Sequence, residues 1–227
     1  EKIFKKFDPQ LQVDLLINDG DQVAHGDIGL RVSGSAISIL SSERLVLNCM
    51  QRMSGIATLT HRLTEKIKHT KARLMDTRKT TPNFRLMEKW AVRIGGGVNH
   101  RFALYDMVML KDNHVDFAGG IQNAINSTHN FLKKNNLDLK IEVETRSLDE
   151  VEQVLKVGGV DFIMLDNMDY QTMKTAVKMI DGRFGTEASG GITEDTLVDV
   201  AECGVDFISM GALTHSVKSM DISLKAF

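Results

Sequence analysis

Residues 72–82 read ARLMDTRKTTP, and residues 107–114 read MVMLKDNH. Each segment begins with a short apolar run, typical of a buried strand, and then changes abruptly to polar and mostly cationic residues. In α/β folds, binding and catalytic residues lie at the carboxyl ends of parallel strands. The two segments therefore predict two strands of one parallel sheet, with a functional site at its carboxyl edge.

The same alternation continues to the end of the chain. We expect strands at 72–76, 107–111, 140–144, 161–166, 185–189 and 205–210, and helices at Phe84–Val92, Ile121–Lys133, Leu148–Val157, Tyr170–Met179 and Glu194–Cys203. Alternating strands and helices predict an α/β protein with a parallel sheet. Six or so strands without a reversal of order favour a (β/α) barrel, complete or incomplete, and a doubly wound open sheet is the alternative.

The first 41 residues have a different pattern of short strands and turns. Val13–Ile17 is a candidate strand, and Leu30–Val32 and Ala36–Leu40 flank Ser33-Gly34-Ser35, which predicts a hairpin. Such strands form a small antiparallel element that is too short to be stable alone.

A helix is expected to follow this element. Ser41-Ser42-Glu43-Arg44 is a suitable start, because serine can cap a helix and glutamate is favourable in its first turn. The mixed apolar and polar pattern continues to about residue 69. Gly55 inside it costs about 1 kcal/mol in a helix and indicates a break or a close contact.

Composition excludes several classes of protein. The chain has 227 residues, 42% of them hydrophobic and 26% charged, and a net charge of −2. A protein with this charge is not a general binder of polyanions, so any anion site is a local cluster of Arg and Lys. Two cysteines, Cys49 and Cys203, indicate reduced thiols, and no apolar run approaches the ~18 residues of a membrane span. We therefore expect a cytoplasmic location.

The ends of the six expected strands carry the chemistry. They supply Thr77, Arg78 and Lys79; Lys111; Glu144; Asp166; Ser189, Gly190 and Gly191; and Gly211, Ala212 and Leu213. The two glycine turns, at the last two strands, favour a phosphate site, because their backbone N–H groups can hold an anion there. Structural turns explain many such glycines, so neither turn is decisive by itself.

The cations and carboxylates near these strand ends indicate which ligands the site would bind. Arg44, Arg78, Lys79, Arg93, Arg101 and Lys111 exceed what one phosphate requires, which indicates a polyanionic or dicarboxylate ligand. Glu144 and Asp166 could bind ribose hydroxyls, hold Mg²⁺ together with phosphates, or stabilise a cationic transition state. Ordinary structural ion pairs are the alternative for both groups. His100, His114 and His215 lack metal-ligand spacing and could donate to an anion.

Taken together, these residues closely resemble the quinolinate phosphoribosyltransferase family. The matching stretches are Glu43-Arg44, Leu47-Asn48, Ser54–Thr58, Asp76–Pro82, Gly95–Gly97, Asn99-His100-Arg101, Lys111–His114, Glu142–Glu144, Leu165–Asn167, Glu187–Ile192 and Gly211–His215. The set covers roughly residues 8–227 and is far more specific than any one motif.

The resemblance implies an α/β fold, an incomplete (β/α) barrel of six or seven strands with a small α+β open-faced sandwich domain. We expect a partial sandwich domain at 1–41, connecting helices at 42–71, the barrel at 72–212 and a segment at 213–227 that returns to the sandwich domain. Family chains usually start some tens of residues earlier, so we expect the amino-terminal part of the sandwich to be missing here.

The resemblance also implies an activity. Family members convert quinolinate and phosphoribosyl pyrophosphate, with Mg²⁺, to nicotinate mononucleotide, pyrophosphate and CO₂ for NAD biosynthesis. The catalytic residues would be Lys111, Glu144 and Asp166. Quinolinate and pyrophosphate would be bound by Arg44, Thr77, Arg78, Lys79, His100, Arg101 and Lys111. The phosphoribosyl group would be bound by Glu144, Asp166, Ser189, Gly190, Gly191, Gly211, Ala212, Leu213 and His215, and Mg²⁺ by Glu144 and Asp166, largely through the substrate.

The resemblance implies a homodimer or higher oligomer in which Arg44 completes the partner's site, with no nucleic acid or membrane partner. Two alternative functions remain. A phosphoribosyltransferase for nicotinate or another aromatic acid has the same fold but needs fewer cations. A non-catalytic sugar-phosphate-binding barrel would not need Glu144 and Asp166 opposite so many cations.

Overall fold

A computed structural model describes all residues from 1 to 227. The helices are α1 Lys2–Phe7, α2 Ala36–Ile67, α3 Arg85–Ile94, α4 Asp112–Ala118, α5 Ile121–Lys134, α6 Leu148–Val157, α7 Tyr170–Ile180, α8 Leu197–Ala201 and α9 Ala212–His215. The strands are β1 Gln12–Leu15, β2 Leu30–Ser33, β3 Arg73–Met75, β4 Val108–Leu110, β5 Ile141–Thr145, β6 Phe162–Asp166, β7 Gly185–Ser189 and β8 Phe207–Ser209. None of the helices is both long and apolar enough to cross a lipid bilayer.

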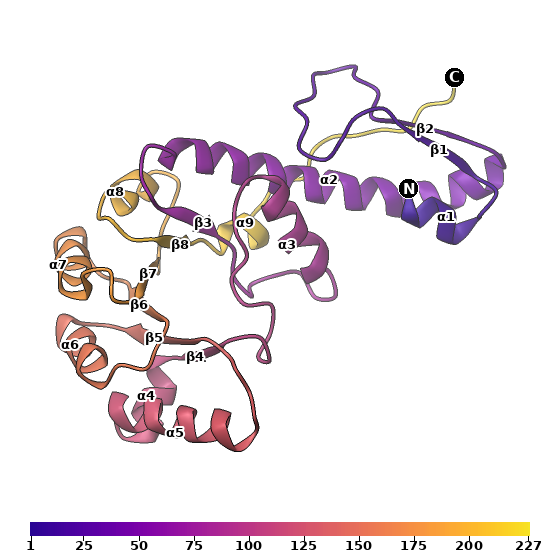
Figure 1. Cartoon of the computed structure of the whole chain (residues 1–227). Coiled ribbons are helices and arrows are strands. Elements are labelled where there is room, and N and C mark those ends of the chain that lie inside the picture. Colours follow the sequence, from indigo (N-terminus) through magenta and orange to yellow (C-terminus); the bar gives the residue numbers. More distant parts are fainter.

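Six strands form one parallel sheet with helices on its outer face (Figure 1). The strand order is β3-β8-β7-β6-β5-β4, so β3 and β4, which are neighbours in the chain, lie at opposite edges and do not pair. Between these edges, only Val98 makes a bridge to Met75. The sheet is therefore a barrel with one open side, and the expected incomplete (β/α) barrel is confirmed with six strands.

Alternation along the strands separates the two faces of the barrel wall. Leu74, Val143, Ile163 and Ile208 belong to the main apolar core, which lies between the strands and the outer helices. Glu142 on β5 and Glu187 on β7 are also buried but lie outside this core. The inner face of the barrel is therefore partly polar.

The amino-terminal region contains β1 and β2, which pair antiparallel, and packs against the first half of α2. A second, small core contains Phe4, Leu11 and Val46. The expected small α+β element is confirmed. The hairpin with a strand at Ala36–Leu40 is wrong, because these residues form the first turns of α2.

The helix α2 begins at Ala36, whereas the sequence analysis predicted a start at Ser41. Ser35 caps the helix, and its Oγ accepts a hydrogen bond from the Ser38 N–H. The alternating apolar residues at 36–40 resemble a strand, but Ile39, Val46 and Met50 pack on the small core with helical spacing. Long-range packing therefore overrides the local β preference.

The helix α2 runs without a break past Gly55 and joins both regions (Figure 1). Gly55 is the site of a close contact, because a Cβ there would clash with the carbonyl of Lys218 in the carboxyl-terminal segment. That segment passes along α2, where Met220 N donates to Gln51 O at 3.0 Å and Gln51 Nε2 donates to Ile222 O at 2.8 Å. One helix thus replaces the expected connecting helices of 42–71, and the domain limits stay a prediction.

Smaller differences affect the ends of elements. The expected helix Glu194–Cys203 is reduced to Leu197–Ala201, because Thr193–Thr196 form a turn held by the Thr196 hydroxyl. Both cysteines are free, with Cys203 buried and Cys49 half-buried.

Candidate active site at the carboxyl rim of the barrel

The predicted residues gather where the six parallel strands end. The cation loop (residues 77–81) follows β3, and Lys111 follows β4. Glu144 and Asp166 lie among the last two residues of β5 and β6. Ser189 ends β7, and the phosphate turn (residues 211–215) follows β8 and includes α9. The strands also pair in register at this end, with Asp166 opposite Ser189 and Met75 opposite Ser209. The structure therefore brings residues from six distant segments to one rim.

Lys111 and Glu144 make a direct but loose contact across β4 and β5. The Lys111 Nζ lies 3.5 Å from Glu144 Oε2, and half of the lysine side chain is exposed. The Lys111 N–H donates to His114 Nδ1 at 3.0 Å, which fixes the backbone at the start of α4. A loose ion pair with a half-exposed lysine contributes about 0–1 kcal/mol to stability, so Lys111 is free to turn toward an anionic ligand.

Asp166 lies beside the glycine turn that follows β7. Asn167 Nδ2 donates to Asp166 Oδ2 at 2.7 Å, and Asn167 N donates to Ser189 O at 2.9 Å. Gly190 has φ +93°, and a Cβ at this position would overlap the Asn167 side chain. Only glycine fits there, and backbone N–H groups of a turn with this conformation can bind an anion.

The phosphate turn and the cation loop touch each other. Thr214 Oγ1 donates to Lys79 O at 2.8 Å, and a Cβ on Gly211 would lie 3.0 Å from the His215 ring and 3.1 Å from Lys79 Cδ. Leu213 is fully buried, so it can offer only its backbone to a ligand. The predicted anion-binding segments of β3 and β8 therefore form one continuous surface.

Arg44 lies away from this surface within the chain. It is exposed on the amino-terminal half of α2, the half that packs against α1 and β2, and it has no ion pair. The carboxyl-terminal half of α2 packs on the barrel. The structure of one chain thus leaves Arg44 apart from the other predicted cations.

His100 and Arg101 lie in the segment that fills the open side of the barrel. His100 Nε2 lies 2.9 Å from Glu142 Oε2 and 3.3 Å from Glu187 Oε2, and its Nδ1 accepts a hydrogen bond from Arg101 N at 2.6 Å. Arg101 is buried and donates through Nη1 to Met107 O at 3.2 Å. Both ring nitrogens of His100 thus face protein groups, and its direct contact with substrate stays a prediction.

This buried cluster holds protons strongly. Burial disfavours a charged imidazole, but hydrogen bonds and the charges of Glu142 and Glu187 raise the pKa of His100 to about 9. Burial, followed by the charge of Glu187, raises the pKa of Glu142 to about 7. The Arg101 N–H opposes a second proton on the ring, so we place the shared proton on the carboxylates.

The same cluster has three donor atoms within 4.8 Å of one another, the spacing of a metal site. A metal at His100 Nε2 would require the ring proton on Nδ1, where the Arg101 N–H already points. The cluster is therefore a poor metal site. Glu144 and Asp166 suit Mg²⁺ better, because they are rim carboxylates, and Mg²⁺ usually takes one or two carboxylates together with substrate phosphates.

Several buried charged residues near the rim were missed by the sequence analysis. Asp76 pairs with Lys89, and it also accepts from Asn99 Nδ2 at 2.5 Å and His100 N at 2.9 Å. Burial raises the pKa of Asp76 and lowers the pKa of Lys89. Glu88 is fully buried beside Arg52. Sequence spacing on α3 gives no sign of these contacts, since Glu88 and Lys89 look like surface charges of a helix.

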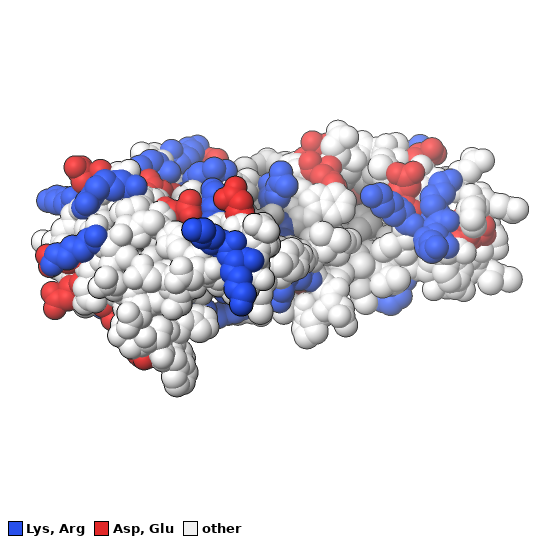
Figure 2. Space-filling view, turned by 60° about the horizontal axis from the view of Figure 1, so that its bottom comes forward, with Lys and Arg blue, Asp and Glu red and all other residues white.

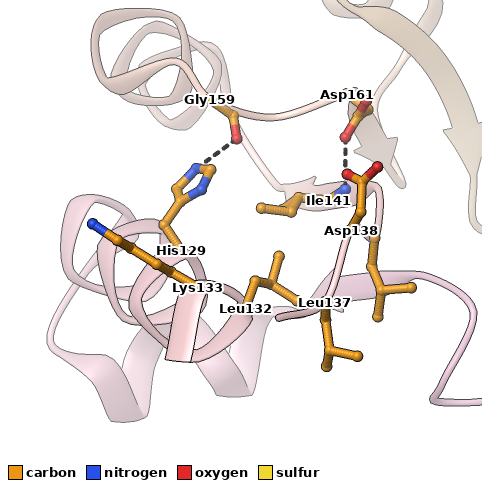
Figure 3. Close-up of a pocket in the computed structure, with 9 residues that line it drawn as sticks. His129, Leu132, Lys133, Leu137, Asp138, Ile141, Gly159 and Asp161 are labelled. Carbon is orange, nitrogen blue, oxygen red and sulfur yellow. Dashed lines mark hydrogen bonds between the residues drawn. The ribbon is translucent and has the colours of Figure 1, made fainter. Parts of the chain in front are cut away.

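Two cavities lie away from the rim. One of about 420 Å³ contains Phe162, Phe207 and Lys140 at the amino ends of the strands, and reaches Glu142 and Glu187 inside the barrel. The other, of about 310 Å³, lies between α5 and the start of β5 (Figure 3). There His129 Nε2 lies 2.7 Å from Gly159 O, which ties α5 to the turn before β6. The larger cavity is also lined by His100 and Arg101, two of the predicted substrate-binding residues, whereas the smaller one includes no predicted site residue.

Comparison with known proteins gives the family. The family model "Quinolinate phosphoribosyl transferase, N-terminal domain" matches residues 1–54, and the corresponding C-terminal domain model matches residues 56–225. The chain belongs to the quinolinate phosphoribosyltransferase family. The resemblance inferred from the motifs is thereby confirmed.

Relatives within this family are similar over nearly the whole chain. A chloroplastic nicotinate-nucleotide pyrophosphorylase [carboxylating] of Arabidopsis thaliana is 50% identical over 99% of this chain and 68% of its own length. A probable nicotinate-nucleotide pyrophosphorylase of Bacillus subtilis is 41% identical over 97% of this chain and 75% of its own length. The crystal structure of NadC from Streptococcus pyogenes has a TM-score of 0.92 and 41% identity, and covers 99% of this chain and 78% of that one.

Proposed function

We propose that this chain transfers the phosphoribosyl group of phosphoribosyl pyrophosphate to quinolinate with decarboxylation. The products are nicotinate mononucleotide, pyrophosphate and CO₂, and the enzyme is a pentosyltransferase of NAD biosynthesis. The observation that carries the proposal is the match of both family domains to residues 1–54 and 56–225. The rim supports it, because cations, carboxylates and glycine turns meet there in one site.

The rim residues suit both halves of this reaction. When pyrophosphate leaves ribose C1, the cation loop and Lys111 would stabilise its negative charge, and Glu144 and Asp166 would stabilise the positive sugar that the pyridine nitrogen attacks. The turns at Ser189–Gly191 and residues 211–215 would hold the 5′-phosphate through backbone N–H groups. Arg78 and Arg101 would bind the quinolinate carboxylates as bidentate donors.

Decarboxylation then follows beside a ring nitrogen that has become cationic. The ring accepts the electron pair left by the departing CO₂, and a proton completes the product. The protein mainly has to hold the geometry. Lys111 and the arginines favour the step if they bind the departing carboxylate less tightly than the transition state.

Mg²⁺ is the proposed metal. Glu144 and Asp166 would hold it, largely through substrate oxygens, because two carboxylates at an open rim are the donors that Mg²⁺ shares with phosphates. When bound, Mg²⁺ neutralises charge on the pyrophosphate leaving group. Omitting Mg²⁺ should abolish turnover, and addition of Mg²⁺ to the metal-free enzyme should restore it.

A homodimer, or a higher oligomer built from it, is the proposed assembly. Arg44 is exposed on α2 without an ion pair, and the same helix exposes the apolar side chains of Ile37, Leu40 and Leu45. A second copy would cover these side chains and place Arg44 in its neighbour's site. Light scattering checks the assembly, and mixing Arg44→Ala chains with Lys111→Ala chains should restore some activity, because one of the two sites in a mixed dimer is then complete.

The partners we propose are the two substrates, with no nucleic acid or membrane. Figure 2 shows acidic and basic side chains interspersed on the face it presents, without one continuous basic surface. A cytoplasmic location stays a proposal, since similar plant proteins are named as chloroplastic or mitochondrial. Imaging of the fluorescently tagged protein in its own cells would decide it.

A second candidate is phosphoribosyl transfer to nicotinate or another monocarboxylic aromatic acid. Release of pyrophosphate and CO₂ should be measured with phosphoribosyl pyrophosphate and Mg²⁺, with quinolinate and nicotinate compared. Both products from quinolinate alone would support the decarboxylating transferase. Pyrophosphate without CO₂ from nicotinate would establish the second candidate. No product from either acid, combined with binding of ribose 5-phosphate, would indicate a sugar-phosphate-binding barrel.

A further inference from the structure

Arg52 on α2 and Glu88 on α3 form a buried ion pair behind the rim. Arg52 Nε and Nη2 donate to Glu88 Oε1 at 3.1 and 2.9 Å. The Glu88 side chain is 0% exposed and that of Arg52 is 23% exposed. Burying such a pair costs desolvation energy that only good geometry and additional hydrogen bonds offset. The additional bonds therefore show what the pair holds.

Glu88 holds the cation loop. Its Oε2 accepts a hydrogen bond from Thr81 N at 3.0 Å, and its Oε1 accepts one from Thr81 Oγ1 at 2.9 Å. Thr81 is two residues beyond Lys79 and three beyond Arg78. A carboxylate fixed in the core thus sets the backbone position at the end of the loop that carries both cations.

Arg52 holds the phosphate turn from the same place. Its Nη2 donates to Thr214 O, and its Nη1 donates to Val217 O at 3.2 Å. Thr214 is itself fully buried and donates to Lys79 O at 2.8 Å. The contacts form a closed circuit from Glu88 through Thr81, Lys79 and Thr214 to Arg52.

We propose that Arg52 and Glu88 are positioning residues that hold the cation loop and the phosphate turn at one fixed separation. This inference rests on the proposed function, in which the two segments bind different parts of the substrates. In that proposal phosphoribosyl pyrophosphate would span both segments, through its pyrophosphate and its 5′-phosphate, and quinolinate would bind between them. Loss of the pair should therefore weaken the use of both substrates together, although neither residue touches a substrate.

Two variants separate positioning from simple charge. In Glu88→Gln the amide can accept from Thr81, but its NH₂ cannot accept from Arg52. In Arg52→Lys the charge is kept, but one ammonium cannot reach Glu88, Thr214 and Val217 at once. The matched control is Glu194→Gln, which removes a partly exposed carboxylate that pairs with Arg62 and Lys66 of the same α2 helix.

Steady-state kinetics with each substrate varied in turn, well below each variant's Tm, form the first measurement. Loss of a hydrogen bond to a charged group corresponds to about tenfold or more. We expect kcat/KM to fall by about that factor for quinolinate and phosphoribosyl pyrophosphate alike in both variants, mostly through KM, and Glu194→Gln to match the wild type. A fall in kcat/KM for one substrate alone would overturn the proposal, and so would an Arg52→Lys variant whose kcat/KM equals that of the wild type.

Hydrogen exchange supplies a measurement that does not depend on activity. Glu88→Gln should speed amide exchange in residues 77–83 and 211–217 together, while Glu194→Gln leaves both segments unchanged. Faster exchange in one segment only would refute the coupling. If the wild type makes no product, the proposed function fails while exchange still tests the coupling. If Glu88→Gln does not fold, Arg52→Lys and Thr214→Val are measured in its place.

Discussion

The charged residues of the rim and those buried behind it are held in opposite ways. At the rim, Lys111 lies 3.5 Å from Glu144 and is half exposed, and Arg44 has no ion pair at all. Behind it, Asp76 and Lys89 are almost completely buried, pair with each other and make further hydrogen bonds to neighbouring residues, and Glu88 is held by both Arg52 and Thr81. The difference indicates that the rim keeps charges available for ligands, while the buried pairs keep the loops in place.

The buried charges themselves differ in how well they are satisfied. Both oxygens of Glu88 accept hydrogen bonds. In the cluster of His100, Glu142 and Glu187, one atom of each side chain lacks a hydrogen bond of good geometry. Unsatisfied buried carboxylates shift their pKa, whereas a satisfied one supports a fixed structure. The contribution of the unsatisfied carboxylates to stability should depend on pH. The contribution of the satisfied carboxylate should depend on the residue that pairs with it.

Removal of the rim cation should have the largest effect. We expect Lys111→Ala to lower turnover by about 10³-fold or more, because in the proposed mechanism the lysine stabilises charge that develops in the transition state. The fold should remain, since its contact with Glu144 is loose. Turnover is measured with quinolinate and phosphoribosyl pyrophosphate, and Tm by calorimetry. Turnover similar to that of the wild type would remove Lys111 from the mechanism and erase the distinction between rim and interior.

Removal of a buried cation should instead affect stability. We expect Lys89→Met to destabilise the fold by about 3 kcal/mol, because Asp76 then keeps a buried charge with only Asn99 and the His100 N–H as partners. Urea unfolding gives the free energy. The double variant Lys89→Met, Asp76→Asn should recover part of the loss. If the loss of stability in the double variant equals the sum of the two single losses, the two residues do not act as a pair.

The sequence predicted the rim better than the interior. Each expected barrel strand is found within two residues at either end, since apolar runs that end in polar residues are a local signal. The rim residues follow directly from those ends. Arg52 and Glu88 are 36 residues apart and sit in ordinary amphipathic helices, so only the packing of α2 on α3 reveals their contact. The strand expected at Ala36–Leu40 failed for the same reason, because Ile39 packs on a core formed by distant residues.

The unsatisfied cluster should make stability depend on pH. The proton shared in the cluster lies on the carboxylates, and the pKa of Glu142 is raised to about 7 in the folded state. The folded protein therefore binds more protons than the unfolded chain. The contribution is fully present below the unfolded pKa of the carboxyl and is lost as pH rises through about 7.

This loss can be measured as Tm between pH 5 and pH 9. We expect the cluster to contribute about 2–3 kcal/mol to the change, or roughly 5–10 degrees of Tm. The double variant Glu142→Gln, Glu187→Gln should show a flatter decline than the wild type, and Glu88→Gln should keep the wild-type slope. Equal slopes in all three proteins would mean that the cluster holds no extra proton.

The smallest effect should come from the rim pair itself, when stability and not turnover is measured. A double-mutant cycle of Lys111→Ala and Glu144→Gln should give a coupling energy below about 1 kcal/mol, because the contact is long and its lysine is half exposed to water. The coupling should decrease further at high salt, unlike that of Asp76 and Lys89. If the coupling energy of Lys111 and Glu144 were as large as that of Asp76 and Lys89, Lys111 would be held in place for the stability of the fold. Loose pairing could then not explain how Lys111 reaches a substrate.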